Sequence, residues 1–142
     1  MNILVSAHSG LRWIALVLLL LAIYNAFTAK EYEKKHRLVN LFTMITFHIQ
    51  LLIGIGLYYN YMTTKIGENW MENDAWRFFG MEHLSGMLLA IVAITIGHSK
   101  SKKGADDDAK FKAIKVWYTL ALILVLVFIP WPFRTALGAG WF

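Results

Sequence analysis

Four long apolar segments alternate with short polar segments along the chain. They run from Val5 to Ala29, Leu38 to Met62, Trp76 to Gly97 and Val116 to Phe133. Each is close to the ~20 residues that a helix needs to cross the hydrocarbon core of a bilayer. Strands cannot explain them, because lipid offers no partner for open backbone edges and spanning barrels alternate over about ten residues. The pattern predicts an all-α fold, a four-helix transmembrane bundle forming one domain over residues 1–142, with helices at about 5–29, 38–62, 76–98 and 113–133.

The basic residues lie mostly in two of the connecting segments. Ten of the fourteen Lys and Arg residues fall within residues 30–37 and 99–115. Because cytoplasmic loops are enriched in Lys and Arg, both segments are predicted to be cytoplasmic and to lie near anionic membrane lipid. The expected topology is up-down-up-down, with both termini on the non-cytoplasmic side. This placement accounts for the net charge of +5, so no nucleic-acid partner is expected.

Composition narrows the chemistry that the chain can support. Hydrophobic residues make up 58% of the sequence and charged residues only 16%, a balance outside that of soluble domains. The absence of cysteine excludes disulfides, thiolate nucleophiles and iron–sulfur ligation. A metal site would therefore use histidine or carboxylate side chains.

The histidines are the most informative residues, because ionisable groups inside a membrane are costly and often mark a functional site. His8 lies near the start of the first segment, and His83 lies roughly 10 Å past Trp76 at 1.5 Å per residue. Both are therefore expected in the outer half of the bundle. Two histidines on different helices at similar depth can supply the two axial nitrogens of a low-spin haem iron. His8 and His83 are the predicted metal ligands of a haem b.

Residues near this pair are expected to complete the cofactor site. Arg12 lies one helical turn beyond His8, where its guanidinium could bind a propionate. Glu82 could orient His83, or could instead bind a proton, a quinol or Arg77. The other predicted cofactor-binding neighbours are small or apolar: Trp13, Gly80, Gly86 and Met87. The glycines would let a porphyrin approach the backbone, and the larger side chains would form walls.

Other histidines leave alternatives open. His48 lies deeper than His83 and is the substitute cofactor ligand, or else a neutral histidine that hydrogen-bonds across the bundle. A second haem near the cytoplasmic side would need His98 and a partner such as His36. Both positions are also ordinary ends of helices, where histidine meets lipid headgroups.

A family resemblance rests on four stretches of the sequence. These are HSGLRW, FHIQLLIG, MEHLSGMLLAIVAITIGH and FIPWPF. Together they resemble a group of small four-helix bacterial membrane proteins described as cytochrome b-like, over nearly the whole chain. The chain is more distantly similar to the membrane protoporphyrinogen oxidase and copper-resistance families, which have a histidine early in helix one and a tryptophan opening helix three. The resemblance implies a multi-pass protein of the bacterial inner membrane with haem b bound by His8 and His83.

Three functions follow from these expectations. The first is electron transfer by a membrane b-type haem protein that is linked to quinol or is a small subunit of a respiratory complex. The second is a haem-assisted membrane oxidase, although His83 stands near the position of a helix-three lysine in the oxidase family, which favours a bis-histidine cytochrome. The third is a cofactor-free structural subunit. All three admit other membrane protein subunits as partners, and whether the chain is an enzyme is left open.

Overall fold

The computed structural model describes residues 2–141, and the fold of these residues is all-helical, without strands. The elements in chain order are α1 (Asn2–Thr28), α2 (Lys34–Thr64), η1 (Trp70–Glu72), α3 (Asp74–Arg77), η2 (Phe78–Glu82), α4 (His83–Lys102), α5 (Asp107–Phe128) and η3 (Thr135–Leu137). Four helical stretches are long and apolar enough to cross a membrane: Ile3–Thr28, Lys34–Thr64, Asp74–Lys102 and Asp107–Phe128. The structure thus contains the four predicted helices, each long and apolar enough to span a membrane.

The third of these stretches is built from three elements that follow one another without a break. It starts after Asn73, whose side chain accepts a hydrogen bond from the backbone N–H of Trp76 at 3.0 Å. The short α3 then passes into η2, a π-helical segment, before α4 begins at His83. Such π segments within helices are rare and are found frequently at functional sites.

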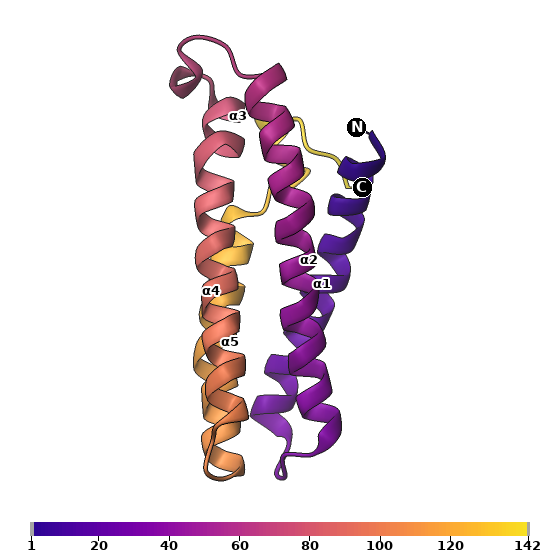
Figure 1. Cartoon of the computed structure of the whole chain (residues 1–142), viewed down its shortest axis with the longest axis vertical. Helices are drawn as coiled ribbons and strands as arrows, with labels where there is room; N and C mark the ends of the chain where they lie inside the picture. Colours follow the sequence, from indigo (N-terminus) through magenta and orange to yellow (C-terminus); the bar gives the residue numbers. More distant parts are fainter. Residues whose placement is uncertain (1, 142) are drawn as a thin grey trace.

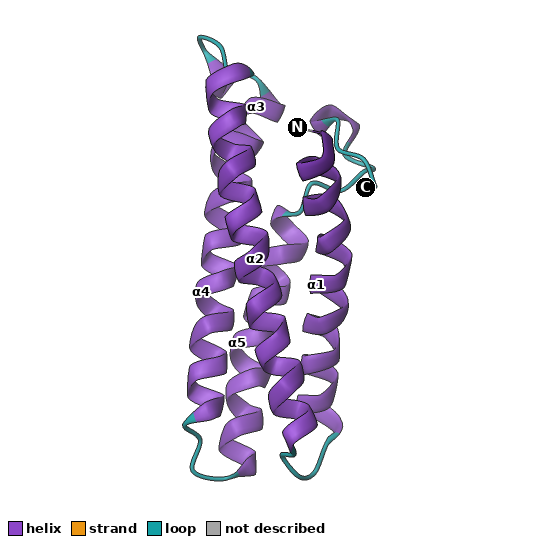
Figure 2. Cartoon of the chain, turned by 45° about the vertical axis from the view of Figure 1, so that its right-hand side comes forward, coloured by secondary structure: helices purple, strands orange, loops and turns teal. Residues whose placement is uncertain are grey.

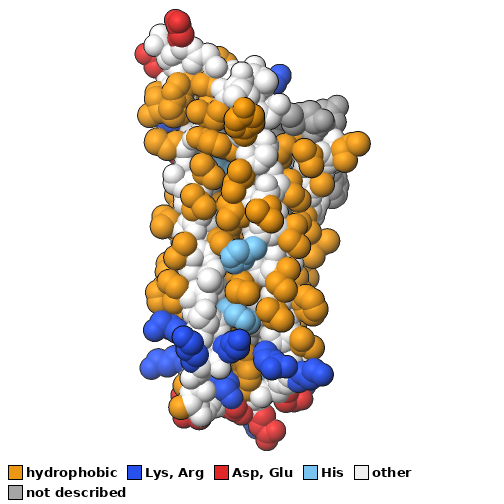
Figure 3. Space-filling model, viewed as in Figure 1, with side chains coloured by type: hydrophobic (Ala, Val, Ile, Leu, Met, Phe, Trp, Pro, Cys, Tyr) orange, Lys and Arg blue, Asp and Glu red, His pale blue; other side chains and the backbone are white. Residues whose placement is uncertain are grey.

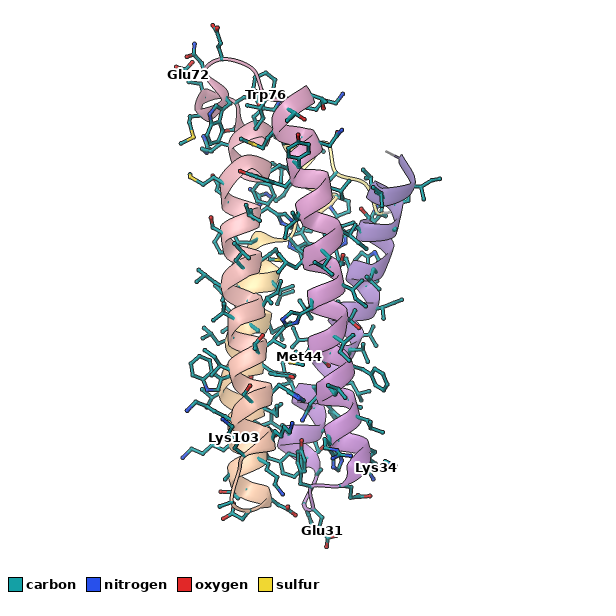
Figure 4. All side chains as sticks on the ribbon, viewed as in Figure 1. Glu31, Lys34, Met44, Glu72, Trp76 and Lys103 are labelled. Atoms are coloured by element: carbon teal, nitrogen blue, oxygen red, sulfur yellow. The ribbon has the colours of Figure 1, made fainter. Side chains whose placement is uncertain are left out.

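The long helices lie side by side along the long axis of the molecule (Figures 1 and 2). α1 packs on α2 and on α5, and α4 packs on α5 and on α2, so each helix contacts two others. The turns after α1 and after α4 lie at the same end of the bundle. Figure 4 places Glu31, Lys34 and Lys103 at this end and Glu72 and Trp76 at the opposite end. We call these the turn end and the loop end.

The fourth helix is displaced relative to the range predicted from the apolar pattern, 113–133. It begins after Asp106, whose side chain accepts a hydrogen bond from the backbone N–H of Ala109 at 2.8 Å and so caps the helix. It ends at Phe128, because Ile129 precedes Pro130 and has the extended backbone, φ −69° and ψ 136°, that this position favours. Capping and proline sterics, rather than hydropathy, set both ends.

Small residues line the contacts between the helices. The fully or almost fully buried core includes Ala15, Ala22, Ala26, Ala90, Ala93 and Ala121. A Cβ atom at Gly97 would lie only 2.7 Å from Cβ of Trp117, and a Cβ atom at Gly86 would overlap the Phe128 ring. Small side chains let membrane helices approach closely. In lipid, this close packing rather than the hydrophobic effect drives the association of helices.

The exterior of the bundle is apolar, unlike that of a soluble protein. Large hydrophobic side chains such as Val17, Leu52 and Val92 are more than half exposed. Figure 3 shows hydrophobic side chains along the visible face and a band of Lys and Arg at the turn end. An apolar surface of this extent fits hydrocarbon rather than water.

Candidate functional site

The structure brings His8 of α1 and His83 of α4 into contact near the loop end of the bundle. The two ring centroids are 6.3 Å apart, and the ring planes are nearly perpendicular, at 82°. Two imidazoles that each bind one metal ion at ~2 Å have centroids about 6 Å apart, so the observed separation suits a shared metal. The depth argument from the sequence thus agrees with this geometry.

A backbone carbonyl fixes the orientation of His83. The Nδ1 atom of His83 lies 2.8 Å from the carbonyl oxygen of Phe128 and, since a carbonyl can only accept, donates a hydrogen bond to it. Phe128 is the last residue of α5, so its carbonyl has no partner within its own helix. In neutral His83 the proton is then on Nδ1, and the lone pair of Nε2 is available to a ligand. Metal-binding histidines commonly have such a carbonyl partner.

His8 is held by its backbone while its ring keeps an unsatisfied atom. The side-chain N–H of Gln50 donates to the carbonyl oxygen of His8 at 2.9 Å. The His8 ring lies against Gly54, where an added Cβ atom would be 3.3 Å from Cε1 of His8. Among the described residues 2–141, the buried Nδ1 of His8 has no hydrogen-bond partner. A buried ring nitrogen without a partner is costly unless a ligand satisfies it.

A cavity of about 400 Å³ opens beside the two histidines, a volume typical of small-molecule and cofactor sites. Its walls are mostly apolar, with contributions from α1, α2, α4 and the chain after α5. The polar or charged side chains that line it are His8, Ser9, Arg12, Gln50, Tyr58, Asn60, Tyr61, Lys65 and His83. Most of the polar residues from α2 lie toward its C-terminal end, so the cavity is more polar near the loop end.

Arg12 lines this cavity, but its terminal nitrogens bind the C-terminal segment of the chain. They donate to the carbonyl oxygens of Pro130, Gly140 and Trp141 at 3.4, 3.3 and 2.9 Å. Arg12 is almost fully buried, and its Nε atom has no partner among the described residues. The guanidinium therefore holds the C-terminal segment over the cavity, and its Nε–H is left without a partner among the described residues.

The other predicted cofactor-binding residues divide between the cavity and the helix contacts. Met87 lines the cavity. Trp13 does not: its ring stacks on Trp141, with centroids 6.0 Å apart, and its N–H donates to the Trp141 carbonyl oxygen at 3.0 Å. Likewise His48 is absent from the lining, and its Nδ1 lies 2.8 Å from the carbonyl oxygen of Met44 one turn earlier.

The two glycines that flank His83 do not give a ligand access to the backbone. A Cβ atom placed at Gly80 would lie 3.1 Å from the ring of Trp70, and a Cβ atom placed at Gly86 would overlap the ring of Phe128. Neither lines the cavity. Both instead let an aromatic side chain of another segment pack closely on the helix.

The carboxylate of Glu82 is engaged away from His83. Its Oε1 accepts from Nε of Arg77 at 2.9 Å, and Arg77 also pairs with Asp74 at 3.0 Å. Of the alternatives that the sequence left open for Glu82, the structure shows the pairing with Arg77.

Sequence reasoning missed the contribution of α2 to this site. Gln50, Gly54, Tyr58 and Tyr61 follow one another at intervals of three or four residues and all line the cavity. This spacing places them on one face of a helix, which is the signal that could have identified them. Within this set, Gly54 makes room for the His8 ring.

The donor set suits an axially ligated cofactor better than a bare metal ion. Among the described residues no group of three or more His, Cys, Asp or Glu side chains could hold an ion. Two histidines beside an apolar cavity match the needs of a haem, which brings four nitrogens of its own.

Comparison with protein-family models, curated proteins and solved structures finds no match to this chain.

Proposed function

We propose that the chain is a b-type haem protein that transfers electrons within a membrane. The observation that carries this proposal is the His8–His83 pair, in which Phe128 fixes one ring and the other ring has an unsatisfied nitrogen. With both histidines as its ligands, a haem would supply electron transfer rather than chemistry on a bound substrate.

His8 and His83 would hold the haem, which supplies one-electron redox chemistry when bound. The Phe128 carbonyl keeps the His83 ring oriented, and Gln50 holds the backbone of His8. The apolar walls exclude water and provide a low dielectric, which tunes the redox potential.

We further propose an up-down-up-down topology in the bacterial inner membrane, with both termini on the non-cytoplasmic side. The band of Lys and Arg at the turn end supports this orientation, because basic residues are enriched in cytoplasmic loops. The His8–His83 pair would then lie in the half of the bilayer away from the cytoplasm.

The polar mouth of the cavity favours a quinol as the small-molecule partner. Tyr58, Asn60, Tyr61 and Lys65 line the part of the cavity nearest the loop end. Hydroxyl and amide groups can hydrogen-bond the oxygens of a quinol head. Because the same groups would also hydrogen-bond a substrate, a haem-assisted oxidase is a second candidate function. Other membrane protein subunits are further proposed electron partners.

The test is to purify the protein in a mild detergent and record absorption spectra of the oxidised and dithionite-reduced forms. We expect a sharp b-type band on reduction, and about one haem per chain by pyridine haemochrome assay. His8→Ala and His83→Ala should each lose the band, because one axial nitrogen is removed in each.

His48→Ala is the matched control, since His48 lies outside the cavity lining. This variant should keep the full haem content. If it loses haem while His8→Ala does not, the ligand assignment is wrong. A helical, monodisperse wild-type protein that never takes up haem would favour the cofactor-free subunit instead.

A further inference from the structure

A second cavity, of about 480 Å³, lies at the turn end of the bundle. It lies between the start of α2, the end of α4 and the first turns of α5, far along the bundle from the His8–His83 pair. Nothing in the proposed electron-transfer role uses it.

Four cations line this cavity: Lys34, Arg37, Lys102 and Lys110. Lys110 is partly neutralised, since its ammonium lies 3.7 Å from Asp107. Within residues 2–141 the structure gives no ion pair to the other three. Three of the four cations that line the cavity therefore have no carboxylate partner among the described residues.

Glu33 is the acidic residue in the lining, and it is engaged by a cation outside the cavity. Its carboxylate lies 2.8 Å from the ammonium of Lys35. The hydrogen bond and the charge of Lys35 lower the pKa of the Glu33 carboxyl. The Glu33 charge is thus already matched by Lys35.

The back wall of the cavity is fixed by a buried polar network. The hydroxyl of Tyr32 accepts hydrogen bonds from the side chains of Asn40 and Ser101, at 3.0 and 3.2 Å. The Tyr32 backbone N–H donates to Asp107 at 2.9 Å, and Tyr118 donates to the Asn40 carbonyl oxygen at 2.9 Å. These bonds join the α1–α2 turn to α2, α4 and α5, so the cavity is pre-formed.

His98 adds an unsatisfied polar atom to the lining. Its Nδ1 is buried and, within the described part of the chain, has no hydrogen-bond partner. A ring N–H directed at an anion would satisfy it, whereas a cation would be repelled by the neighbouring Lys and Arg side chains.

We propose that this cavity binds a phosphate group, either the phosphodiester of an anionic lipid headgroup or inorganic phosphate. Arg37 can donate two parallel hydrogen bonds to phosphate oxygens, and Lys34 and Lys102 supply further charge. The cavity lies at the turn end, where Figure 3 shows a band of Lys and Arg side chains on the visible face. Basic pockets between membrane helices at the cytoplasmic side are established sites for lipid phosphates.

The experiment uses full-length, delipidated protein in a non-ionic detergent. Short-chain phosphatidylglycerol, short-chain phosphatidylcholine and sodium phosphate are each titrated, and binding is followed by native mass spectrometry and intrinsic fluorescence. Arg37→Gln/Lys102→Gln removes two cavity charges and should weaken binding roughly 25-fold, about fivefold for each charge. Lys103→Gln/Lys112→Gln removes the same charge outside the lining and should leave binding within about twofold.

The arms separate the two sources of phosphate. Tight binding of phosphatidylglycerol that the cavity variant alone weakens supports a lipid headgroup, and the same pattern with sodium phosphate supports a soluble anion. The proposal is overturned if both double variants lose binding affinity equally. It is also overturned if wild type binds neither phosphatidylglycerol nor sodium phosphate. His98→Leu tests the cavity without a change in formal charge, and it should weaken binding several-fold while His98→Gln, which keeps a donor, should restore most of it.

Discussion

Both ends of this bundle bury polar groups, but the hydrogen bonding of these groups differs between the two ends. At the turn end, Tyr32, Asn40, Ser101 and Tyr118 form a closed set of hydrogen bonds. At the loop end, the described residues leave buried polar atoms of His8, Arg12 and Gln50 without partners. A satisfied network stabilises a fold, whereas unsatisfied atoms beside a cavity are costly until a ligand binds.

This difference distinguishes polar groups that form a hydrogen-bonded network from polar groups that lie unpartnered beside a cavity. Of the five unpartnered buried side-chain atoms in the described residues, three belong to the lining of the loop-end cavity and one, in His98, to the turn-end cavity. The polar groups without partners thus gather around the cavities. Helix packing, in contrast, rests on alanines and glycines. The predictions below test whether the two kinds of buried polar group respond differently to substitution.

The largest effect is expected at the contact that orients His83. Gly86→Ala places a methyl group into the Phe128 ring and pushes the end of α5 from α4. We expect a loss of about 3 kcal/mol in the free energy of unfolding, because a tightly packed contact is overfilled. Gly56→Ala, where nothing lies within 4 Å of the added Cβ, is the control and should change stability by less than ~0.5 kcal/mol. SDS-induced unfolding followed by circular dichroism measures both, and equal losses would contradict the packing argument.

A paired comparison of two polar side chains should give the next largest effect. Asn40→Ala removes a donor to Tyr32 from a closed network at a position only 3% exposed. It should cost about 2 kcal/mol, because buried partners are left unsatisfied. Gln50→Ala at the loop end should cost under about 1 kcal/mol, since its Oε1 already lacks a partner and one bond to His8 is lost. A larger loss for Gln50→Ala in cofactor-free protein would reverse the comparison.

Hydropathy was sufficient to predict the four helices, and local chemistry explains where it failed. Apolar blocks of spanning length have few alternatives in lipid, so the helix count followed directly. The fourth helix differs from its predicted range because Asp106 caps its first turn, and because the helix ends at Phe128, ahead of Pro130, while the apolar run continues. Both signals are readable from the sequence.

The site was only partly predictable, because position along a helix gives depth but not direction. Depth placed His8 and His83 at the same level, and the structure brings their rings together. Spacing alone could not tell that Gly86 faces Phe128 and that Gly80 faces Trp70. Nor could it reveal that the carbonyl at the end of α5 accepts from His83, since that contact depends on where the helix stops.

A smaller effect is expected from a single hydroxyl of the turn-end network. Tyr118→Phe removes the hydrogen bond to the Asn40 carbonyl oxygen without changing the shape of a fully buried ring. The free energy of unfolding should fall by about 1 kcal/mol. Tyr24→Phe, at an exposed position on α1, should leave it unchanged in the same assay. Indistinguishable variants would mean that the network contributes little to stability.

The smallest expected effect is the one that most directly separates the two ends. In haem-free protein, His8→Leu replaces a ring with an unpartnered nitrogen by an apolar side chain, so stability should stay equal or rise by ~0.5 kcal/mol. His36→Leu at the turn end should instead cost about 1 kcal/mol, because Nδ1 of His36 accepts from the backbone N–H of Glu33 at the start of α2. Unfolding of both variants in SDS gives the sign of each change in the free energy of unfolding. A clear loss for His8→Leu would mean that His8 serves the fold, and the unsatisfied nitrogen would no longer argue for a ligand.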